Sequence, residues 1–181
     1  MSAETAIRIA TFLDANHVMS LATCGADGPH AASVFYVRDG LALLWVSDPK
    51  SRHSTELAAN ARVAATIAPD CFDYDDIRGV QISGRAHVIK DASERANAEA
   101  MLQARYPYLA RMSESPSAMR EAYQRIEFYR LEPTRVVLID NSHGFGHKDT
   151  LELGDNSLQS VVAKPNADVH ATPPPRADRV R

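Results

Sequence analysis

One stretch of the chain combines side chains that bind anions. Its residues are Ser47, Asp48, Pro49, Lys50, Ser51, Arg52, His53 and Ser54. Asp48-Pro49 predicts the end of a strand, and Ser51 predicts a helix that begins at Arg52, with the serine hydroxyl as its N-cap. The first N–H groups of a helix lack intrahelical partners and carry the positive end of its dipole, so hydroxyls and cations beside them favour phosphate. The stretch therefore predicts a phosphate site, and a polar surface turn with a capped helix is the alternative.

Outside this stretch, the sequence contains no motif that defines a catalytic centre. The GxGxxG and GxxxxGK[ST] phosphate loops and the GxSxG elbow are all absent. His143 and His147 are four residues apart, but glycines between them disfavour a helix, and zinc needs further ligands. Cys24 and Cys71 lack ligand spacing, and a reactive thiolate requires a low-pKa environment that a sequence does not reveal. We therefore predict no metal site and no catalytic side chain.

The elements around the phosphate stretch are mostly strands. Alternating apolar residues and turn signals predict strands at 17–23, 31–37, 41–47, 62–68, 77–89, 126–131 and 134–139, and helices at 4–16, 52–60, 92–104 and 116–124. Gly79 and Gly84 inside the long strand indicate bulges or a close approach by another group. Because strands and helices do not alternate regularly, a doubly wound sheet is disfavoured. We predict a mainly β (α+β) fold, a small antiparallel barrel with peripheral helices.

Composition narrows the class of protein. The chain has 181 residues, 45% of them hydrophobic and 24% charged, with a net charge of −3. These values are typical of one globular domain, and the net charge argues against sequence-independent nucleic-acid binding. No apolar run approaches the roughly 18 residues of a membrane helix, and the N-terminus does not have the pattern of a secretory signal. With only two cysteines, we predict a soluble, cytoplasmic protein with reduced thiols.

The last residues of the chain differ from the rest. Between Gly154 and Arg181 there is no Phe, Tyr or Trp, and four of the ten prolines fall there. Such a segment buries too little apolar surface to offset the entropy lost on ordering. We predict a folded domain over 1–153 and a flexible, Pro-rich C-terminal tail over 154–181. The alternative is that the tail docks on a partner subunit through Leu158, Val161 and Val162.

The order and spacing of several segments resemble the FMN-binding split-barrel superfamily, also called the pyridoxamine 5'-phosphate oxidase-like proteins. The resemblance covers about residues 5–153 and is carried by HVMSLAT, AASVFYV, WVSDPKSRHSTELAANARVAATI, IRGVQISGRAHVI and FYRLEPTRVVLIDNSHGFGHKDTLEL. It implies a six-stranded antiparallel split β-barrel that forms a homodimer, with FMN at the subunit interface. It also implies a flavin-dependent oxidoreductase that passes hydride or electrons through flavin N5 to an unidentified small molecule. A nicotinamide nucleotide is one candidate reductant.

The resemblance also assigns the cofactor contacts. The family's Ser-x-Lys phosphate motif falls on Ser51, Arg52 and His53, so a histidine replaces the lysine, and Lys50 or Arg52 would supply the missing charge. Val46 and Ser47 would line the ribityl and phosphate path. The remaining implied contacts are Ala32, Ser33 and Val34 along the isoalloxazine, Gln81 from the other side, and Asn141 and Ser142 from the partner subunit.

One departure from the family limits the substrate. True pyridoxamine phosphate oxidases end with an arginine-and-histidine motif that grips the substrate phosphate, and residues 136–153 contain no match to it. Oxidation of pyridoxamine phosphate is therefore not expected. Two alternatives to an FMN enzyme stay open: a non-enzymatic flavin- or haem-binding carrier or sensor on the same fold, and a deazaflavin in place of FMN.

Overall fold

The structure is a computed structural model, and it describes residues 3–115 and 118–153. The C-terminal tail predicted over residues 154–181, together with its alternative docking role, lies outside the described residues. None of the helices within the described ranges is both long enough and apolar enough to cross a membrane.

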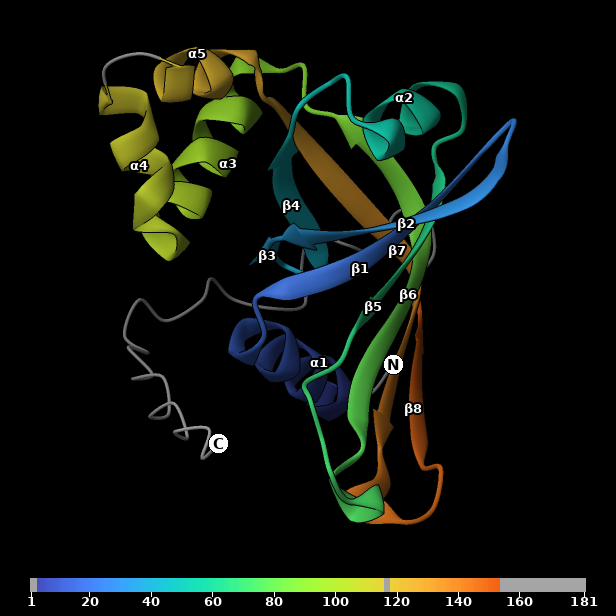
Figure 1. The fold of residues 1–181 in the computed structure, drawn as a ribbon. Coiled ribbons are helices and arrows are strands. Elements are labelled where there is room, and N and C mark those ends of the chain that lie inside the picture. Colours follow the sequence, from blue (N-terminus) through green and yellow to red (C-terminus); the bar gives the residue numbers. More distant parts are fainter. Residues whose placement is uncertain (1–2, 116–117, 154–181) are drawn as a thin grey trace, which may run out of the picture.

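Eight antiparallel strands form one sheet (Figure 1). In chain order they are β1 (Val18–Gly25), β2 (Gly28–Phe35), β3 (Val37–Asp39), β4 (Ala42–Ser47), β5 (Arg62–Ile67), β6 (Arg78–Val88), β7 (Glu127–Asp140) and β8 (Lys148–Glu152). Their order in the sheet is β2-β1-β5-β6-β7-β4-β3, and β8 pairs with β7. The two end strands, β2 and β3, are separated in the chain by Tyr36 alone. The sheet therefore curls until its ends meet, which agrees with the predicted antiparallel barrel.

The predicted count of six strands is corrected to eight. The second strand of the barrel is interrupted at Tyr36 and so counts as β2 and β3. β8, which the sequence analysis did not predict, extends the sheet beyond β7. The separate strands predicted at 126–131 and 134–139 are also wrong, because they form the single strand β7.

A bulge explains how β7 continues through Pro133. The pairing of β6 with β7 shifts register between Ser83 and Gly84, where Gly84 faces Pro133 and Thr134 is the extra residue. Proline is tolerated at a bulge because no ladder hydrogen bond from its nitrogen is needed there. A Cβ atom at Gly84 would lie only 2.3 Å from the carbonyl oxygen of Glu132. Both the predicted bulge and the predicted close approach are therefore confirmed at Gly84.

Replacing Gly84 by alanine is expected to destabilise the fold by about 1–3 kcal/mol, because a backbone oxygen must move to admit the new methyl group. The neighbouring Ser83→Ala, which changes an exposed side chain, is expected to stay within about 0.5 kcal/mol of the wild type. Urea denaturation of the three proteins measures both values. Equal midpoints for the two variants would contradict the close approach.

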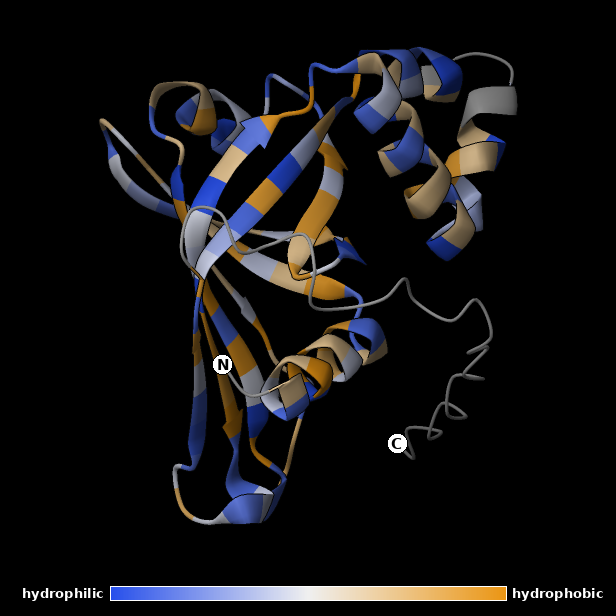
Figure 2. Ribbon diagram, turned by 180° about the vertical axis from the view of Figure 1, so that it is seen from behind, coloured by the Kyte–Doolittle hydropathy of each residue, from blue (hydrophilic) through white to orange (hydrophobic). Residues whose placement is uncertain are grey.

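Two hydrophobic clusters hold the elements in place. The larger one fills the barrel with inward-facing side chains and is closed by Ile9 and Leu13 of α1 (Ala3–Ala15), both 0% exposed. The smaller one joins α3 (Ala92–Arg105) and α4 (Pro107–Glu114) to the outside of the barrel through Leu102, Leu109 and Phe128. Alternating hydrophobic and hydrophilic bands along the strands follow this arrangement (Figure 2). The period-2 pattern thus determines which strand face meets the core.

The helices differ from their predictions mainly after α3. The remaining helices are α2 (Arg52–Ala59), α5 (Ala118–Arg125) and the short 3-10 helices η1 (Tyr74–Asp76) and η2 (Asn141–His143). Tyr106 ends α3 as predicted, but Pro107 also begins α4, which was not predicted. Proline at the first helical position has no N–H to leave unpaired, so it starts helices as readily as it ends them. Ser115 ends α4 instead of capping the next helix, which begins at Ala118.

Candidate functional site

The predicted phosphate stretch lies where β4 leads into α2, as the sequence analysis expected. The Asp48 side chain accepts a hydrogen bond from the Lys50 N–H at 2.8 Å, and the Asp48 carbonyl accepts one from the Ser51 N–H at 2.9 Å. Such a turn is typical of aspartate, whose side chain bonds the backbone two residues on. It directs the chain from the strand into a helix that packs against β1 and β2.

Two serine hydroxyls contact the imidazole of His53 at the start of α2, and a third lies next to one of them. His53 Nε2 lies 2.8 Å from Ser47 Oγ and 3.1 Å from Ser51 Oγ. The Ser51 hydroxyl donates to Ser54 Oγ at 2.8 Å. His53 is 8% exposed, and its burial, with the nearby charge of His30, lowers the pKa of His53 below its usual value. The cluster is therefore a set of hydroxyls around a neutral imidazole at neutral pH.

The predicted capping bond of Ser51 is wrong. Ser51 is the N-cap residue of α2, but its side chain accepts no capping hydrogen bond from the helix. Its hydroxyl is engaged instead with Ser54 and His53. The N–H groups of the first turn are consequently not bonded to the capping side chain, and they keep the partial positive charge that attracts an anion.

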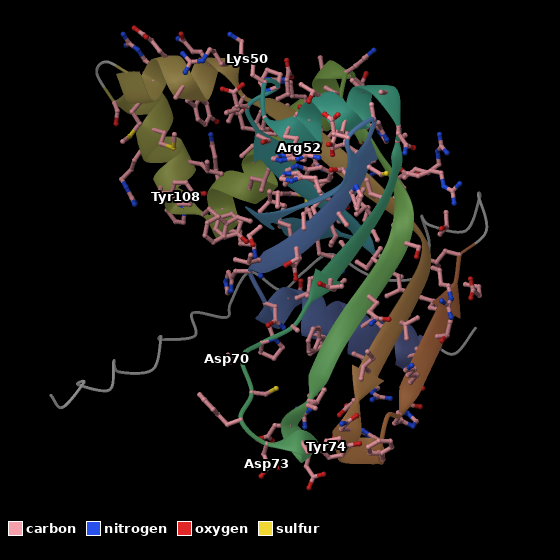
Figure 3. All side chains as sticks on the ribbon, turned by 45° about the vertical axis from the view of Figure 1, so that its right-hand side comes forward. Lys50, Arg52, Asp70, Asp73, Tyr74 and Tyr108 are labelled. Carbon is pink, nitrogen blue, oxygen red and sulfur yellow. The ribbon has the colours of Figure 1, made fainter. Side chains whose placement is uncertain are left out.

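Two cations stand beside this helix start (Figure 3). Lys50 is exposed. Arg52, whose side chain is 48% exposed, donates from Nε to Glu56 Oε1 at 2.8 Å. Neither terminal nitrogen of Arg52 has a hydrogen-bond acceptor within the described residues. The guanidinium therefore keeps its bidentate fork free, which is the geometry that matches a phosphate group.

Glu56 and Thr23 also belong to this cluster, and neither was predicted as a site residue. Glu56 Oε2 accepts a hydrogen bond from Thr23 Oγ1 on β1 at 2.5 Å. This bond, and then the one from Arg52, lowers the pKa of Glu56 below its usual value. The spacing of Arg52 and Glu56, four residues apart on a helix, was a signal available in the sequence. The contact with Thr23 was not, because 33 residues separate the two.

Other predicted contacts lie on two different faces of the barrel. Ala32 and Val34 of β2 are half-buried, as is Val46 near the end of β4, whereas Ser33 is exposed on the opposite face of β2. Gln81 is exposed on β6. The strand register places these exposed residues in one row across four strands: Ser33, Ser20, Thr66 and Gln81. The structure thus brings Ser33 and Gln81 onto one outer face of the sheet.

Asn141 and Ser142 lie in the turn between β7 and β8, at the opposite end of the molecule from α2 (Figure 1). Asn141 donates to the Tyr74 carbonyl at 3.1 Å and accepts from the Gly146 N–H at 3.2 Å. The Ser142 hydroxyl donates to Asp140 Oδ1 at 2.6 Å. Burial raises the pKa of Asp140, but the hydrogen bonds from Ser142 and the charge of Arg78 outweigh it and lower the pKa overall. Within this chain both side chains stabilise the turn, and their contact with a cofactor from the partner subunit stays a prediction.

The described ranges contain no group of three or more His, Cys, Asp or Glu side chains arranged to hold a metal ion. His143 and His147 instead lie next to carboxylates, at 3.2 Å from Asp140 and 3.4 Å from Asp149. Cys24 and Cys71 are both free and exposed.

A curled antiparallel barrel with outer helices, and a cluster of hydroxyls and cations where a strand leads into a helix, are the features expected of a split-barrel protein. The chain belongs to the pyridoxamine 5'-phosphate oxidase family, whose family model matches residues 6–139. The superfamily to which the sequence was assigned by resemblance is thereby confirmed.

Relatives and solved structures agree with this assignment. The UPF0306 protein of Serratia proteamaculans is 32% identical over 143 residues, which are 78% of this chain and 90% of that protein. A heme binding protein from Mycobacterium smegmatis has a TM-score of 0.64 at 22% identity, covering 84% of this chain and 58% of its own. A heme storage protein from Vibrio cholerae has a TM-score of 0.57 at 18% identity, covering 74% of this chain and 91% of its own. The two structures show the fold alone.

Proposed function

We propose that this protein binds FMN and acts as a flavin-dependent oxidoreductase on a small-molecule substrate. The observation that carries the proposal is the start of α2, where the N-cap side chain leaves the helix N–H groups unbonded and Arg52 keeps its terminal nitrogens free. These donors surround the position where the family's phosphate motif falls.

The donor set fits a phosphate monoester. Such a group presents three strong acceptor oxygens and about −1.5 to −2 charges at pH 7. The hydroxyls of Ser47, Ser51 and Ser54, the first N–H groups of α2 and the Arg52 guanidinium offer hydrogen bonds to these oxygens, and Lys50 adds a charge. Helix N-termini and charge-assisted bonds of this kind are the usual means of holding phosphate.

The rest of FMN has matching surfaces in the same part of the fold. β2 pairs with β1 alone among the described strands, so alternate N–H and C=O groups of residues 28–35 point away from its partner and suit the polar edge of a flavin ring. The half-buried Ala32, Val34 and Val46 offer apolar contact. Bound FMN would supply the redox chemistry, and these residues would hold it, orient it and exclude water.

The proposal includes a homodimer with FMN between its subunits, in the cytoplasm. The exposed row of Ser33, Ser20, Thr66 and Gln81 supports a dimer. These uncharged polar side chains form an exposed row across four strands that a second copy can approach. Gln81 would then reach the cofactor across the interface, together with Asn141 and Ser142 of the other subunit.

A haem carrier or sensor is the second candidate function. It is favoured by two solved structures with this fold, one titled a heme binding protein and the other a heme storage protein. A fold of this kind accommodates more than one planar cofactor, so the choice between flavin and haem depends on the site and not on the barrel.

Ligand titration of the full-length protein separates these functions. We expect FMN at about 100 times its dissociation constant to raise the melting temperature by roughly 5–10 °C, and NADH or NADPH to reduce the bound flavin. A deazaflavin and haem serve as competing ligands in the same assay. Absence of any FMN-induced shift, together with a Soret band on haem addition, would favour the haem carrier over the flavoenzyme.

A further inference from the structure

A carboxylate lies inside the candidate phosphate site, which is unexpected beside a dianion. Glu56 is 9% exposed and projects from the second turn of α2 toward β1. Its two oxygens have different partners: Oε1 accepts from Arg52 and Oε2 accepts from Thr23. By charge alone Glu56 offsets Arg52 and weakens the attraction for phosphate. A carboxylate at this position is therefore better explained by an effect on the orientation of its neighbours than by its charge.

Glu56 is fixed in place from the β1 side. A Cβ atom at Gly25 would lie 2.8 Å from Glu56 Cγ, so any larger residue at that position of β1 would push the glutamate side chain out of its place. The Thr23 hydroxyl holds the far oxygen of the carboxylate. One turn later, the Asn60 side chain donates to the Cys24 carbonyl at 3.3 Å and ties the end of α2 to the same strand. The carboxylate is thus wedged between helix and sheet.

This fixed carboxylate restrains Arg52. An arginine side chain has many rotamers, and ordering a free one on binding costs conformational entropy. Glu56 takes only the Nε–H of Arg52, so the two terminal nitrogens stay available for an external anion. A guanidinium held in this way meets its ligand with less entropy left to lose.

We infer that Glu56, anchored by Thr23, is a positioning residue that holds the Arg52 fork ready for the phosphate group of the cofactor. The inference rests on the proposed function, because the phosphate in question belongs to FMN. Glu56 would thereby contribute to a preference for FMN over riboflavin, which lacks the phosphate group.

The ratio of riboflavin to FMN dissociation constants tests the inference without reference to turnover. Glu56→Ala is expected to lower this ratio roughly tenfold, by analogy with the loss seen when a hydrogen-bonded partner that orients a metal-binding side chain is removed. Glu56→Gln, which still offers an oxygen to Arg52 and a second polar atom to Thr23, is expected to restore it. Thr23→Val is expected to lower the ratio by less than Glu56→Ala does. The riboflavin dissociation constant is expected to stay within about twofold of the wild-type value in all three variants.

Two further variants serve as controls. Glu99→Ala removes a carboxylate on another helix, α3, whose hydrogen bonds go to Gln103 and Tyr123 and to no residue of the candidate site, and it is expected to leave the ratio unchanged. In an Arg52→Ala background, Glu56→Ala is expected to have no further effect on the ratio. Circular dichroism melting of each variant identifies any that fails to fold, in which case Thr23→Val and Glu56→Gln decide the question.

The outcomes separate the inference from the function on which it rests. If the wild type binds FMN no more tightly than riboflavin, the phosphate site itself is wrong and both proposals fail. If Arg52→Ala removes the preference for FMN but Glu56→Ala keeps it or strengthens it, the phosphate site stands and Glu56 is only a competing negative charge. Loss of the preference in Glu56→Ala with rescue by Glu56→Gln supports the positioning role.

Discussion

Replacing Arg52 by alanine is expected to weaken FMN binding by roughly 10- to 100-fold, because a charge-assisted, bidentate contact to the phosphate is lost. The protein is expected to remain folded, since the Arg52 side chain is 48% exposed and Glu56 keeps its hydrogen bond from Thr23 when Arg52 is removed. Quenching of flavin fluorescence on titration of FMN with protein measures the affinity.

Arg135→Ala is a closely matched control. Arg135 also donates from Nε to a glutamate, Glu152 Oε1, at 2.8 Å and is similarly exposed at 52%, but it lies on β7, away from the start of α2. Its removal is expected to leave FMN affinity unchanged.

Ser51→Ala removes a hydroxyl from the same site and is expected to weaken FMN binding about tenfold. Wild-type affinity in both Arg52→Ala and Ser51→Ala would mean that the phosphate binds elsewhere.

The sequence was sufficient for the parts of the fold that depend on local pattern. Period-2 alternation predicted the hairpin of β1 and β2, and Gly84 predicted an irregularity that is the bulge where β6 pairs with β7. The prediction failed where local signals compete. Glu132-Pro133 resembles a turn, yet the bulge opposite Gly84 lets β7 pass through it, and that pairing partner lies some 50 residues earlier in the chain.

In the candidate site, too, local sequence was informative and long-range contacts were not predictable. Residues 47–54 are contiguous, so their types alone predicted the gathering of hydroxyls and cations. The orientation of each group depended on contacts across the fold. Ser51 was expected to cap α2, but the buried imidazole of His53 competes for its hydroxyl, and Thr23 reaches Glu56 only because α2 packs on β1.

The position that departs from the family motif also has consequences for pH. By the family resemblance, His53 falls where the phosphate motif has a lysine, and burial keeps the pKa of His53 below its usual value. A phosphate placed beside Nε2 would favour the protonated imidazolium, so FMN binding is expected to take up a proton at His53. The affinity should therefore rise as the pH falls toward the histidine range and decline as the pH rises above it. The groups that share this environment are His30 on β2 and Glu56 on α2.

Replacing His53 by lysine is expected to tighten FMN binding at pH 8 by roughly tenfold, because a permanent charge replaces a neutral imidazole beside the phosphate. It is also expected to remove the proton uptake. His53→Gln keeps a polar side chain without a titrating group, so its pH profile reports only the ionisation of the FMN phosphate, whose pKa is about 6. Dissociation constants of the wild type and both variants from pH 5.5 to 8 isolate the contribution of His53 by difference. Parallel profiles for wild type and His53→Gln, or a His53→Lys protein that binds FMN no more tightly at pH 8, would show that His53 does not face the phosphate.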